Sequence, residues 1–323
     1  MRTVFLDELF SQYEPGFWES LEQITEVVRY DRTRDDQVVQ RSRNADILVT
    51  CDVPITEEHL ARLPNLKYIC VCSTGYDHIC IDAASQRGIL VSHAPGYSTS
   101  SVAQSAAALL LQLALRTAEH SDAVRSGRWS SIGTSTFTVT ERHELHGKVM
   151  GIIGYGAIGK RTGEIARAMG MEILAHHTAK PYRGYAQGVQ WTGLKQLLSK
   201  SDAVSLHCPL TPDTRGMIDA ETLAYMKPSA YLINTARGEL INEEDLAQAL
   251  HEGKIAGAGL DVLSQEPPES SNPLLCAPNC IITPHNAWNT AESRRLLQEI
   301  CRTNIESFLK GEPAHIVKVN AKK

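Results

Sequence analysis

Short apolar runs, each closed by polar or turn-forming residues, recur along the whole chain. In the second half these runs cover 148–153, 171–175, 203–207, 230–236, 256–262 and 280–283. Runs of this length predict buried strands, and amphipathic helical patterns such as 243–252 lie between them. The regular alternation of strands and helices favours a doubly wound parallel sheet.

The first part of the chain shows the same alternation. Its predicted elements are strands at 45–50, 68–72 and 89–92 and a helix at 57–63. A long helical pattern then begins at Ser98 or Thr99, either of which suits the N-cap, and runs on toward Ser126 and Gly127. A last helix is predicted at 291–309. The predicted fold class is therefore α/β, with two parallel-sheet units.

A glycine motif at 154–159 follows the strand 148–153 directly and opens a helix. This position between a strand and a helix is typical of a dinucleotide-binding loop. Gly154 would permit the tight turn, Gly156 the close approach of a pyrophosphate, and Gly159 the packing of the helix on the strand. The alternative is a glycine-rich turn that binds nothing.

Three later strands end in polar side chains that suit one reaction. Arg237 follows the strand beginning at Ala230, Glu266 comes shortly after the next strand, and His285 closes Thr283-Pro284-His285. Because the carboxyl ends of parallel strands share one edge of the sheet, we expect these three side chains to face one crevice. They would supply a carboxylate anchor and an acid/base pair.

Each of the three residue types has a chemical reason. The planar guanidinium of Arg237 can hold a carboxylate oxygen and a carbonyl oxygen together. Histidine titrates in the useful range, and we expect Glu266 to raise the pKa of His285 and orient its ring. A sharp turn explains Gly238. The alternatives are an arginine paired with Glu239 and a solvated loop carboxylate at Glu266.

Composition excludes several classes of protein. The chain has 323 residues, which suits two domains, and a net charge of −5, which gives no reason to expect nucleic acid or an anionic membrane as a partner. The longest apolar stretch, 106–115, is too short to cross a bilayer. Asp7 and Glu8 stand where a signal peptide would be apolar, so we expect a cytoplasmic protein.

The eight cysteines are expected to be free thiols, mostly buried, in a reducing compartment. Cys70 and Cys72 are expected on one strand but on opposite faces of it. Cys276 and Cys280 lack a second pair to complete a zinc site, and no metal site is predicted. Cys208 is expected to form part of the wall of the cofactor site and not to act as a nucleophile.

Taken together, the motifs resemble the D-isomer-specific 2-hydroxyacid dehydrogenases over almost the whole chain. The matching stretches are 73–77, 97–104, 127–130, 154–159, 206–211 and the three strand ends. Within that family, Gln104, Trp288 and the segments 127–130 and 263–268 resemble the glycerate dehydrogenase (hydroxypyruvate reductase) branch.

The resemblance implies a domain plan and a set of site residues. Residues 98–285 would form a Rossmann-type cofactor domain, and 1–97 with 286–323 a smaller, discontinuous flavodoxin-like substrate domain. A homodimer would form around 99–125. Arg237, Glu266 and His285 would be catalytic. The substrate would contact Ser73, Thr74, Gly75, Arg237, His285 and Trp288. The cofactor would contact Gly154, Gly156, Ala157, Ile158, Gly159, His177, Thr178, Lys180, Cys208, Pro209, Thr214, Thr235, Ala236 and Asp261.

The end of the second strand of the cofactor domain departs from the NAD pattern. An NAD-specific site places an acidic residue there to bind the ribose hydroxyls, whereas this chain has His177, Thr178 and Lys180, with Arg183 nearby. These residues favour NADP(H) over NAD(H). Packing of His177 on the adenine is the alternative reading.

The function expected is reduction of hydroxypyruvate or glyoxylate to D-glycerate or glycolate by NAD(P)H. One alternative is a relative that acts on a bulkier 2-keto acid. The other is a nicotinamide-sensing binding protein that resembles the family's corepressors, although the chain has no long disordered tail to recruit partners.

Overall fold

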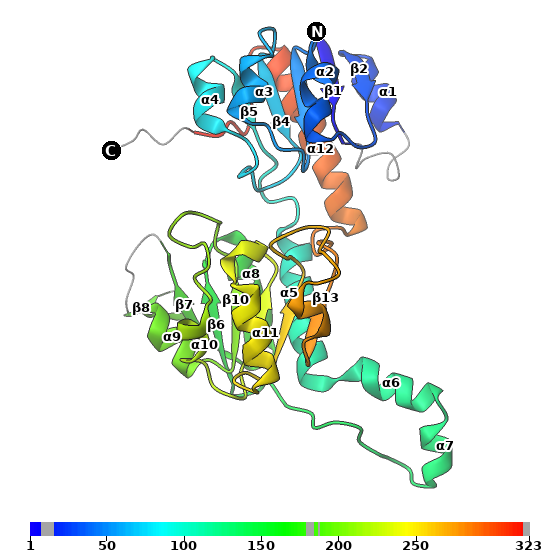
Figure 1. The fold of residues 1–323 in the computed structure, drawn as a ribbon, viewed down its shortest axis with the longest axis vertical. Helices are drawn as coiled ribbons and strands as arrows, with labels where there is room; N and C mark the ends of the chain where they lie inside the picture. The colour runs from blue at the N-terminus through cyan, green and yellow to red at the C-terminus, as the bar shows by residue number, and fades with distance from the viewer. Residues whose placement is uncertain (8–15, 179–183, 187, 319–323) are drawn as a thin grey trace. The chain divides into compact units, whose positions relative to one another are not determined.

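The computed structural model describes residues 1–7, 16–178, 184–186 and 188–318, and the chain divides into two compact units (Figure 1). Unit 1 comprises Met1–Ser98 and Asn289–Lys323, and unit 2 comprises Thr99–Trp288. The sequence-based boundaries fall after residues 97 and 285. The assignment of unit 1 to the substrate and unit 2 to the cofactor remains a prediction.

Unit 1 is built on a five-stranded parallel sheet. Its strands are β1 (Arg2–Phe5), β2 (Glu26–Arg29), β3 (Ile47–Thr50), β4 (Tyr68–Val71) and β5 (Leu90–Ser92), in the order β2-β1-β3-β4-β5. Its helices are η1 (Asp35–Gln37), α1 (Phe17–Glu22), α2 (Val38–Ser42), α3 (Glu57–Ala61), α4 (Ile81–Gln86) and α12 (Ala291–Leu309). The strand order is that of flavodoxin-like folds, which confirms the predicted class.

The last helix, α12, packs on β4 inside unit 1. The rings of Tyr68 and Phe308 stack with centroids 4.2 Å apart, and the Tyr68 hydroxyl donates to Ser92 Oγ at 2.6 Å. Asn304, fully buried, donates from Nδ2 to the carbonyl of His93 at 3.0 Å. An aromatic stack and satisfied buried polar groups therefore fix this helix against the sheet.

Unit 2 is built on an eight-stranded sheet. Its strands are β6 (Val149–Ile153), β7 (Glu172–His176), β8 (Gly184–Ala186), β9 (Val189–Trp191), β10 (Ala203–Leu206), β11 (Tyr231–Asn234), β12 (Gly257–Leu260) and β13 (Cys280–Ile282), in the order β13-β12-β11-β10-β6-β7-β9-β8. The neighbouring strands are parallel, as predicted, except that β8 adds to the edge as an antiparallel partner of β9. The remaining order is that of a Rossmann fold.

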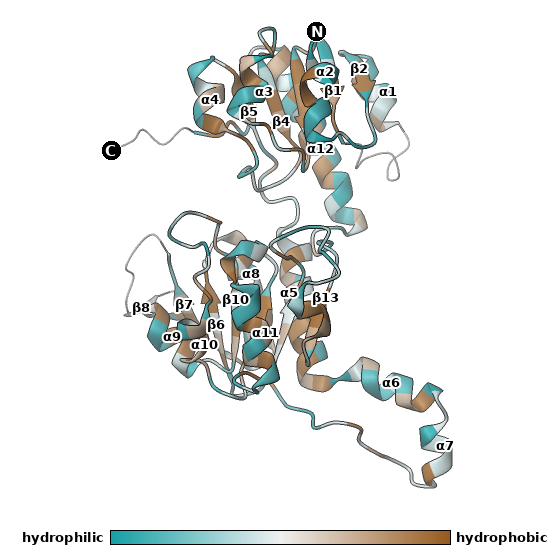
Figure 2. Ribbon diagram, viewed as in Figure 1, coloured by the Kyte–Doolittle hydropathy of each residue, from teal (hydrophilic) through white to brown (hydrophobic). Residues whose placement is uncertain are grey.

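Helices cover both faces of the unit 2 sheet, whose strands are the apolar centre of the unit (Figure 2). They are α5 (Thr99–Leu115), α8 (Ala157–Ala168), α9 (Leu194–Lys200), α10 (Ala220–Leu223), α11 (Glu243–His251) and the short turns η2 (Gly238–Leu240) and η3 (Pro273–Cys276). Helix α5 packs on α8, β11 and β12 and buries Leu110 and Leu113 completely. Each such leucine contributes about 1.5–3 kcal/mol.

The predicted long helix after Thr99 is wrong in one respect, because it is broken. Helix α5 ends at Leu115, Arg116 adopts a left-handed φ of 51°, and α6 (Thr117–Arg125) and α7 (Arg128–Ile132) follow as an arm of unit 2 (Figure 1). No residue of α6 is buried, so the core that supports α5 ends where the helix does. Among the described residues no helix is long and apolar enough to cross a membrane.

The expectation that Cys70 and Cys72 point to opposite faces is also wrong. Side chains two residues apart on a strand share a face, and both thiols contact Cys301 of α12. All eight cysteines lie among the described residues, and all are free thiols.

Candidate active site

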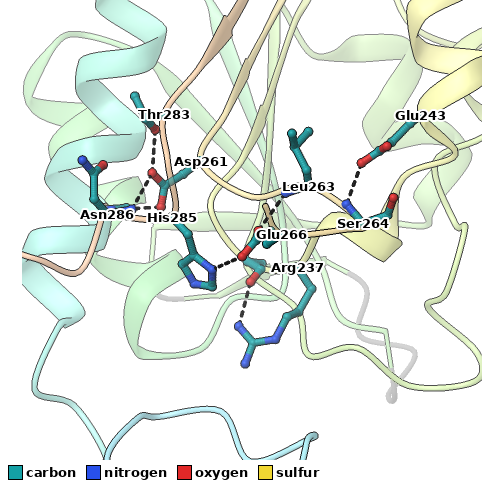
Figure 3. Close-up of polar contacts among 11 residues, drawn as sticks. Arg237, Glu243, Asp261, Leu263, Ser264, Glu266, Thr283, His285 and Asn286 are labelled. Atoms are coloured by element: carbon teal, nitrogen blue, oxygen red, sulfur yellow. Dashed lines mark hydrogen bonds and ion pairs between the residues drawn. The ribbon is translucent and has the colours of Figure 1, made fainter. Parts of the chain in front are cut away.

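The ion pair between His285 and Glu266 is the centre of the site (Figure 3). His285 Nδ1 lies 2.5 Å from Glu266 Oε2, and Glu266 Oε1 accepts the backbone N–H of Leu263 at 2.9 Å. The two side chains are 40% and 36% exposed. The backbone N–H of Leu263 therefore holds the carboxylate of the pair in place, while both side chains remain accessible to a small molecule.

The pKa of Glu266 lies below its ordinary value. Partial burial raises it, but the hydrogen bond and charge of His285, the N–H of Leu263 and the charge of Arg237 outweigh burial. The carboxylate is therefore ionised at neutral pH and accepts a proton-bearing Nδ1. Nε2 is then the ring atom that can exchange a proton with a substrate.

Asp261 holds the loop that carries His285. Its backbone carbonyl accepts the N–H of His285 at 2.8 Å, and its carboxylate accepts Thr283 Oγ1 at 2.5 Å and the N–H groups of Asn286 and Ala287 at 3.0 and 2.9 Å (Figure 3). These contacts fix His285 at a left-handed φ of 48°. Burial raises the pKa of Asp261 against these hydrogen bonds. Its predicted contact with the cofactor remains a prediction.

Arg237 stands at the end of β11 on a loop that Asn234 shapes. The buried Asn234 accepts the N–H of Ala236 at 3.0 Å and donates to the carbonyl of Arg237 at 2.8 Å, while Arg237 Nη1 donates to the carbonyl of Ala236 at 2.9 Å. No role was predicted for Asn234. A polar residue closing a four-residue buried strand was the available signal.

Gly238 is required for a different reason from the predicted sharp turn. The φ of Gly238 is not positive, so its backbone conformation does not require glycine. A Cβ at this position, however, would lie 1.9 Å from the carbonyl carbon of Leu263. Only glycine lets the Arg237 loop pack on the backbone that leads to Glu266. Glu243, also missed from the sequence, accepts the N–H of Ser264 at 2.6 Å and braces the same segment.

Unit 2 thus brings together Arg237, Glu266 and His285, the three residues predicted to be catalytic, as Figure 3 shows. The charge of Arg237 reaches Glu266, since it contributes to lowering that residue's pKa. The cation of Arg237 can bind an anionic substrate, and the imidazole of His285, supported by the Glu266 carboxylate, can transfer one proton.

The glycine loop between β6 and α8 has the geometry that close packing demands. Gly154 has φ of 92°, and a Cβ there would lie 2.4 Å from the backbone nitrogen of Cys208. A Cβ on Gly159 would lie 2.3 Å from the carbonyl oxygen of Gly154. By contrast, a Cβ on Gly156 would meet nothing within 4 Å. Two glycines therefore serve packing and the third borders open space.

These residues fit a dinucleotide. Gly156 is the N-cap of α8 and makes no side-chain cap, so the first N–H groups of the helix can serve a phosphate, and Ala157 beside it is exposed. The Thr235 Oγ1 atom is buried and has no hydrogen-bond partner within the described part of the chain. An orphaned hydroxyl at the end of β11 is consistent with a polar ligand there.

Several other residues that are predicted to contact the cofactor also stabilise the fold. Burial raises the pKa of Cys208 to about 11, so it is a neutral thiol wall. Thr214 Oγ1 donates to the carbonyl of Pro209 at 2.8 Å and accepts the N–H of Thr211, which folds the loop after β10. Ile158 is half-buried in α8. Cofactor contacts of these residues remain predictions.

His177 and Thr178 follow β7 beside the glycine loop. The N–H of Gly154 donates to the carbonyl of His176, the last residue of β7, at 2.9 Å. This bond places the segment that would meet a ribose next to the phosphate loop. Lys180 and Arg183 lie outside the described residues.

The loop 73–75 follows β4 in unit 1 and is closed by its own side chains. Ser73 Oγ donates to the carbonyl of Gly75 at 2.5 Å, and Thr74 Oγ1 donates to the carbonyl of Ala94 at 3.0 Å. The substrate contacts predicted for these three residues, and for the half-buried Trp288 of unit 2, remain predictions.

Comparisons with known proteins show which family this chain is similar to. Residues 107–287 match the model of the D-isomer specific 2-hydroxyacid dehydrogenase NAD binding domain. The chain is 43% identical to a hydroxypyruvate reductase of Blautia hydrogenotrophica, covering 93% of this chain and 94% of that protein. It is 39% identical to a glycerate dehydrogenase of Methylorubrum extorquens, covering 87% and 88%.

Among solved structures, an acyclic imino acid reductase in complex with NADPH and D-Arg is similar with a TM-score of 0.89. It is 30% identical, and the match covers 98% of this chain and all of that one. The matched domain, the extent of the identity and the glycine loop agree with an oxidoreductase that uses a nicotinamide cofactor. The chain belongs to the D-isomer specific 2-hydroxyacid dehydrogenase family.

Proposed function

We propose that this enzyme reduces hydroxypyruvate and glyoxylate to D-glycerate and glycolate. The observation that supports it most is the 2.5 Å contact between His285 Nδ1 and Glu266 Oε2, with Arg237 on the neighbouring strand end. The names of the two curated relatives, a hydroxypyruvate reductase and a glycerate dehydrogenase, support the choice of substrate.

The roles of the three side chains follow from their chemistry. Arg237 binds the carboxylate of the keto acid and polarises its carbonyl through the same planar fork. His285 donates a proton from Nε2 to the carbonyl oxygen, and Glu266 stabilises the protonated ring before that transfer. A reduced nicotinamide, when bound, supplies the hydride. Gly156, Ala157 and Thr235 would hold this cofactor.

NADP(H) is the cofactor we propose as preferred. The position after β7 holds His177 and Thr178 rather than an acidic residue, so nothing there repels a 2′-phosphate. An imidazole and a hydroxyl can both donate to that phosphate. A preference for NADH in the assay below would contradict this part of the proposal.

We also propose a homodimer assembled through α5–α7. Val124, Trp129 and Ile132 of the arm are 42%, 46% and 41% exposed, and they are three of the eight large apolar side chains exposed in the described part of the chain. Light scattering on the purified protein should give twice the mass of the chain, and Trp129→Glu should lower it. A monomeric wild type at micromolar concentration would contradict the dimer.

The test of the activity is loss of reduced-nicotinamide absorbance. Purified protein is assayed with NADH and NADPH in parallel against hydroxypyruvate, glyoxylate, pyruvate and a branched 2-keto acid. We expect the highest kcat/KM with hydroxypyruvate and NADPH. Turnover of the branched acid alone would mean that the enzyme acts on a bulkier 2-keto acid. Tight cofactor binding without any turnover would favour a nicotinamide-sensing binding protein.

A further inference from the structure

Three thiols meet in the core of unit 1, outside the machinery described above. Cys72 Sγ lies 3.1 Å from Cys301 Sγ, and Cys70 Sγ lies 3.9 Å from the same atom. Cys70, Cys72 and Cys301 are 0%, 2% and 1% exposed. Cys51, also buried, lies close to Cys72. The cluster joins the end of β4 to the middle of α12.

The cluster's surroundings decide which chemistry it can support. Ser92, Asn304 and Tyr68, which interact with Cys70, are neutral side chains. Three thiolates around a divalent ion would leave a net negative charge in this core, and a buried unpaired charge is costly. A disulfide is neutral and apolar, and its bond of about 2.05 Å requires the Cys72 and Cys301 sulfurs to approach by about 1 Å.

We propose that Cys72 and Cys301 form an oxidisable thiol pair, which a hydroperoxide of the hydrogen peroxide class converts to a disulfide. One thiol ionises and its thiolate attacks the peroxide, whose O–O bond breaks to give a sulfenic acid and hydroxide, and the hydroxide takes up the released proton and leaves as water. The second thiol attacks the sulfenic sulfur, the S–S bond forms, and a second water leaves. Two thiols lose two electrons and two protons, and the peroxide is reduced to two waters.

The position of the pair gives the disulfide a consequence for activity, which rests on the proposed function. Cys72 directly precedes the loop 73–75 that is predicted to bind the substrate carboxylate, and Cys301 is anchored in the longest helix of unit 1. A shift of the strand end toward α12 displaces this loop. Displacement of a positioning group by about 1 Å can cost up to two orders of magnitude in catalysis.

The first experiment asks whether the bond forms, independently of activity. The full-length protein is reduced, freed of reductant, treated with hydrogen peroxide, denatured with an alkylating reagent present, and digested. We expect a crosslinked peptide pair containing Cys72 and Cys301, and two fewer alkylated thiols than in the reduced protein. Burial raises the pKa of the Cys72 thiol, so the yield at a fixed time should increase with pH.

Matched variants define the site. Cys276→Ala removes an exposed thiol of unit 2 and should leave the crosslink unchanged, whereas Cys301→Ala and Cys72→Ala should each abolish it. The wild-type peptide map needs no variant, so a misfolded substitution does not remove the test. Full alkylation of both thiols after oxidation would overturn the proposal. So would stoichiometric zinc or copper in the isolated wild type that is lost in Cys301→Ala.

The second experiment measures the effect on catalysis with hydroxypyruvate and glyoxylate as the probes. The oxidised wild type should show a KM increase on the order of tenfold with nucleotide binding unchanged, and a thiol reductant should reverse it. Oxidised Cys301→Ala should keep the KM of its reduced form. A formed crosslink with an unchanged KM would overturn the link to the loop. Absence of turnover in the reduced protein would instead contradict the proposed function and leave the crosslink measurement standing.

Discussion

Asp261 in unit 2 and Asp7 in unit 1 both stand just after a strand of a parallel sheet, but the loops that they hold differ in exposure. Each follows a parallel strand, β12 or β1, and each carboxylate accepts N–H groups from the loop after the neighbouring strand. Asp7 receives those of Cys51, Asp52 and Val53 at 2.8–3.2 Å. Desolvation raises the pKa of both carboxyl groups, against these hydrogen bonds.

What differs is the loop that each aspartate holds. The Asp261 loop presents His285, which is 40% exposed and paired with Glu266. The Asp7 loop contains Cys51 and Val53, which are 2% and 7% exposed. A buried carboxylate at a strand end is therefore a structural device in both units. We propose that catalytic capacity depends on the accessible His285 and its partner Glu266 in unit 2.

The largest effect should come from removing the group that distinguishes the two loops. His285→Ala should lower kcat by about 10²–10⁴, because a positioned acid/base contributes that much. Binding of the nicotinamide, followed by fluorescence, should not change. His251→Ala, in the last turn of α11, is the matched control and should retain activity. A kcat within threefold of wild type for His285→Ala would remove His285 from the mechanism.

Loss of the anchor should be nearly as severe. Arg237→Ala should raise KM for hydroxypyruvate and lower kcat together, at a total cost of about 2–5 kcal/mol in kcat/KM. Arg237→Lys should recover little, since an ammonium cannot reproduce the planar fork. Arg215→Ala, which removes a 61% exposed arginine, should be neutral. Wild-type kcat/KM for glyoxylate in Arg237→Ala would show that the anchor is assigned wrongly.

The support of His285 by Glu266 should be visible as a pH effect. Glu266→Gln should reduce kcat about 10–100-fold and move the alkaline limb of reduction to lower pH by about one unit, because the lost charge favoured the imidazolium. The pKa of Glu266 lies below its ordinary 4.5. Its stabilising contribution is therefore present above pH 4.5 and lost as the pH falls through the folded-state value.

The control for this profile is Glu269→Gln, which changes an exposed carboxylate on the same segment. It should leave both limbs of the profile in place. An unshifted alkaline limb in Glu266→Gln would mean that Glu266 orients the ring without stabilising its charge.

A direct test of the comparison exchanges both aspartates for asparagine. Each substitution puts an amide among N–H donors and should destabilise the protein by about 1–3 kcal/mol. Asp261→Asn should in addition lower kcat by about tenfold, because it loosens the loop that fixes His285. Asp7→Asn should keep the kcat profile against pH. If Asp7→Asn lowered kcat as much as Asp261→Asn, the two loops would not differ in their effect on catalysis.

The smallest effect is expected outside both loops, at the end of β7. His177→Asp should change the ratio of kcat/KM for NADH over NADPH in favour of NADH by about tenfold, since an acidic side chain accepts the ribose hydroxyls and repels a 2′-phosphate. His177→Asn, which adds no charge, should change the ratio less. An unaltered ratio in His177→Asp would exclude this segment from cofactor choice.

The local patterns predicted most of the unit 2 strands, because buried parallel strands are continuous apolar runs. They did not predict β2, whose residues are half-exposed at the edge of its sheet, or the antiparallel β8 and β9. They also predicted one helix where Arg116 divides two. The helical pattern of the sequence continues from α5 into α6, whereas the core that supports α5 ends at Leu115. The sequence alone does not show where that core ends.

The sequence by itself predicted the glycine loop and the residues that we propose as catalytic, Arg237, Glu266 and His285. Each depends on its own chemistry and on its position at a strand end. Only the tertiary structure decided what holds them, namely Asn234, Gly238, Glu243 and Asp261. These residues act through backbone groups distant in the chain. The convergence of Cys70 and Cys72 on Cys301 was likewise decided by packing, because it depends on where α12 lies on β4.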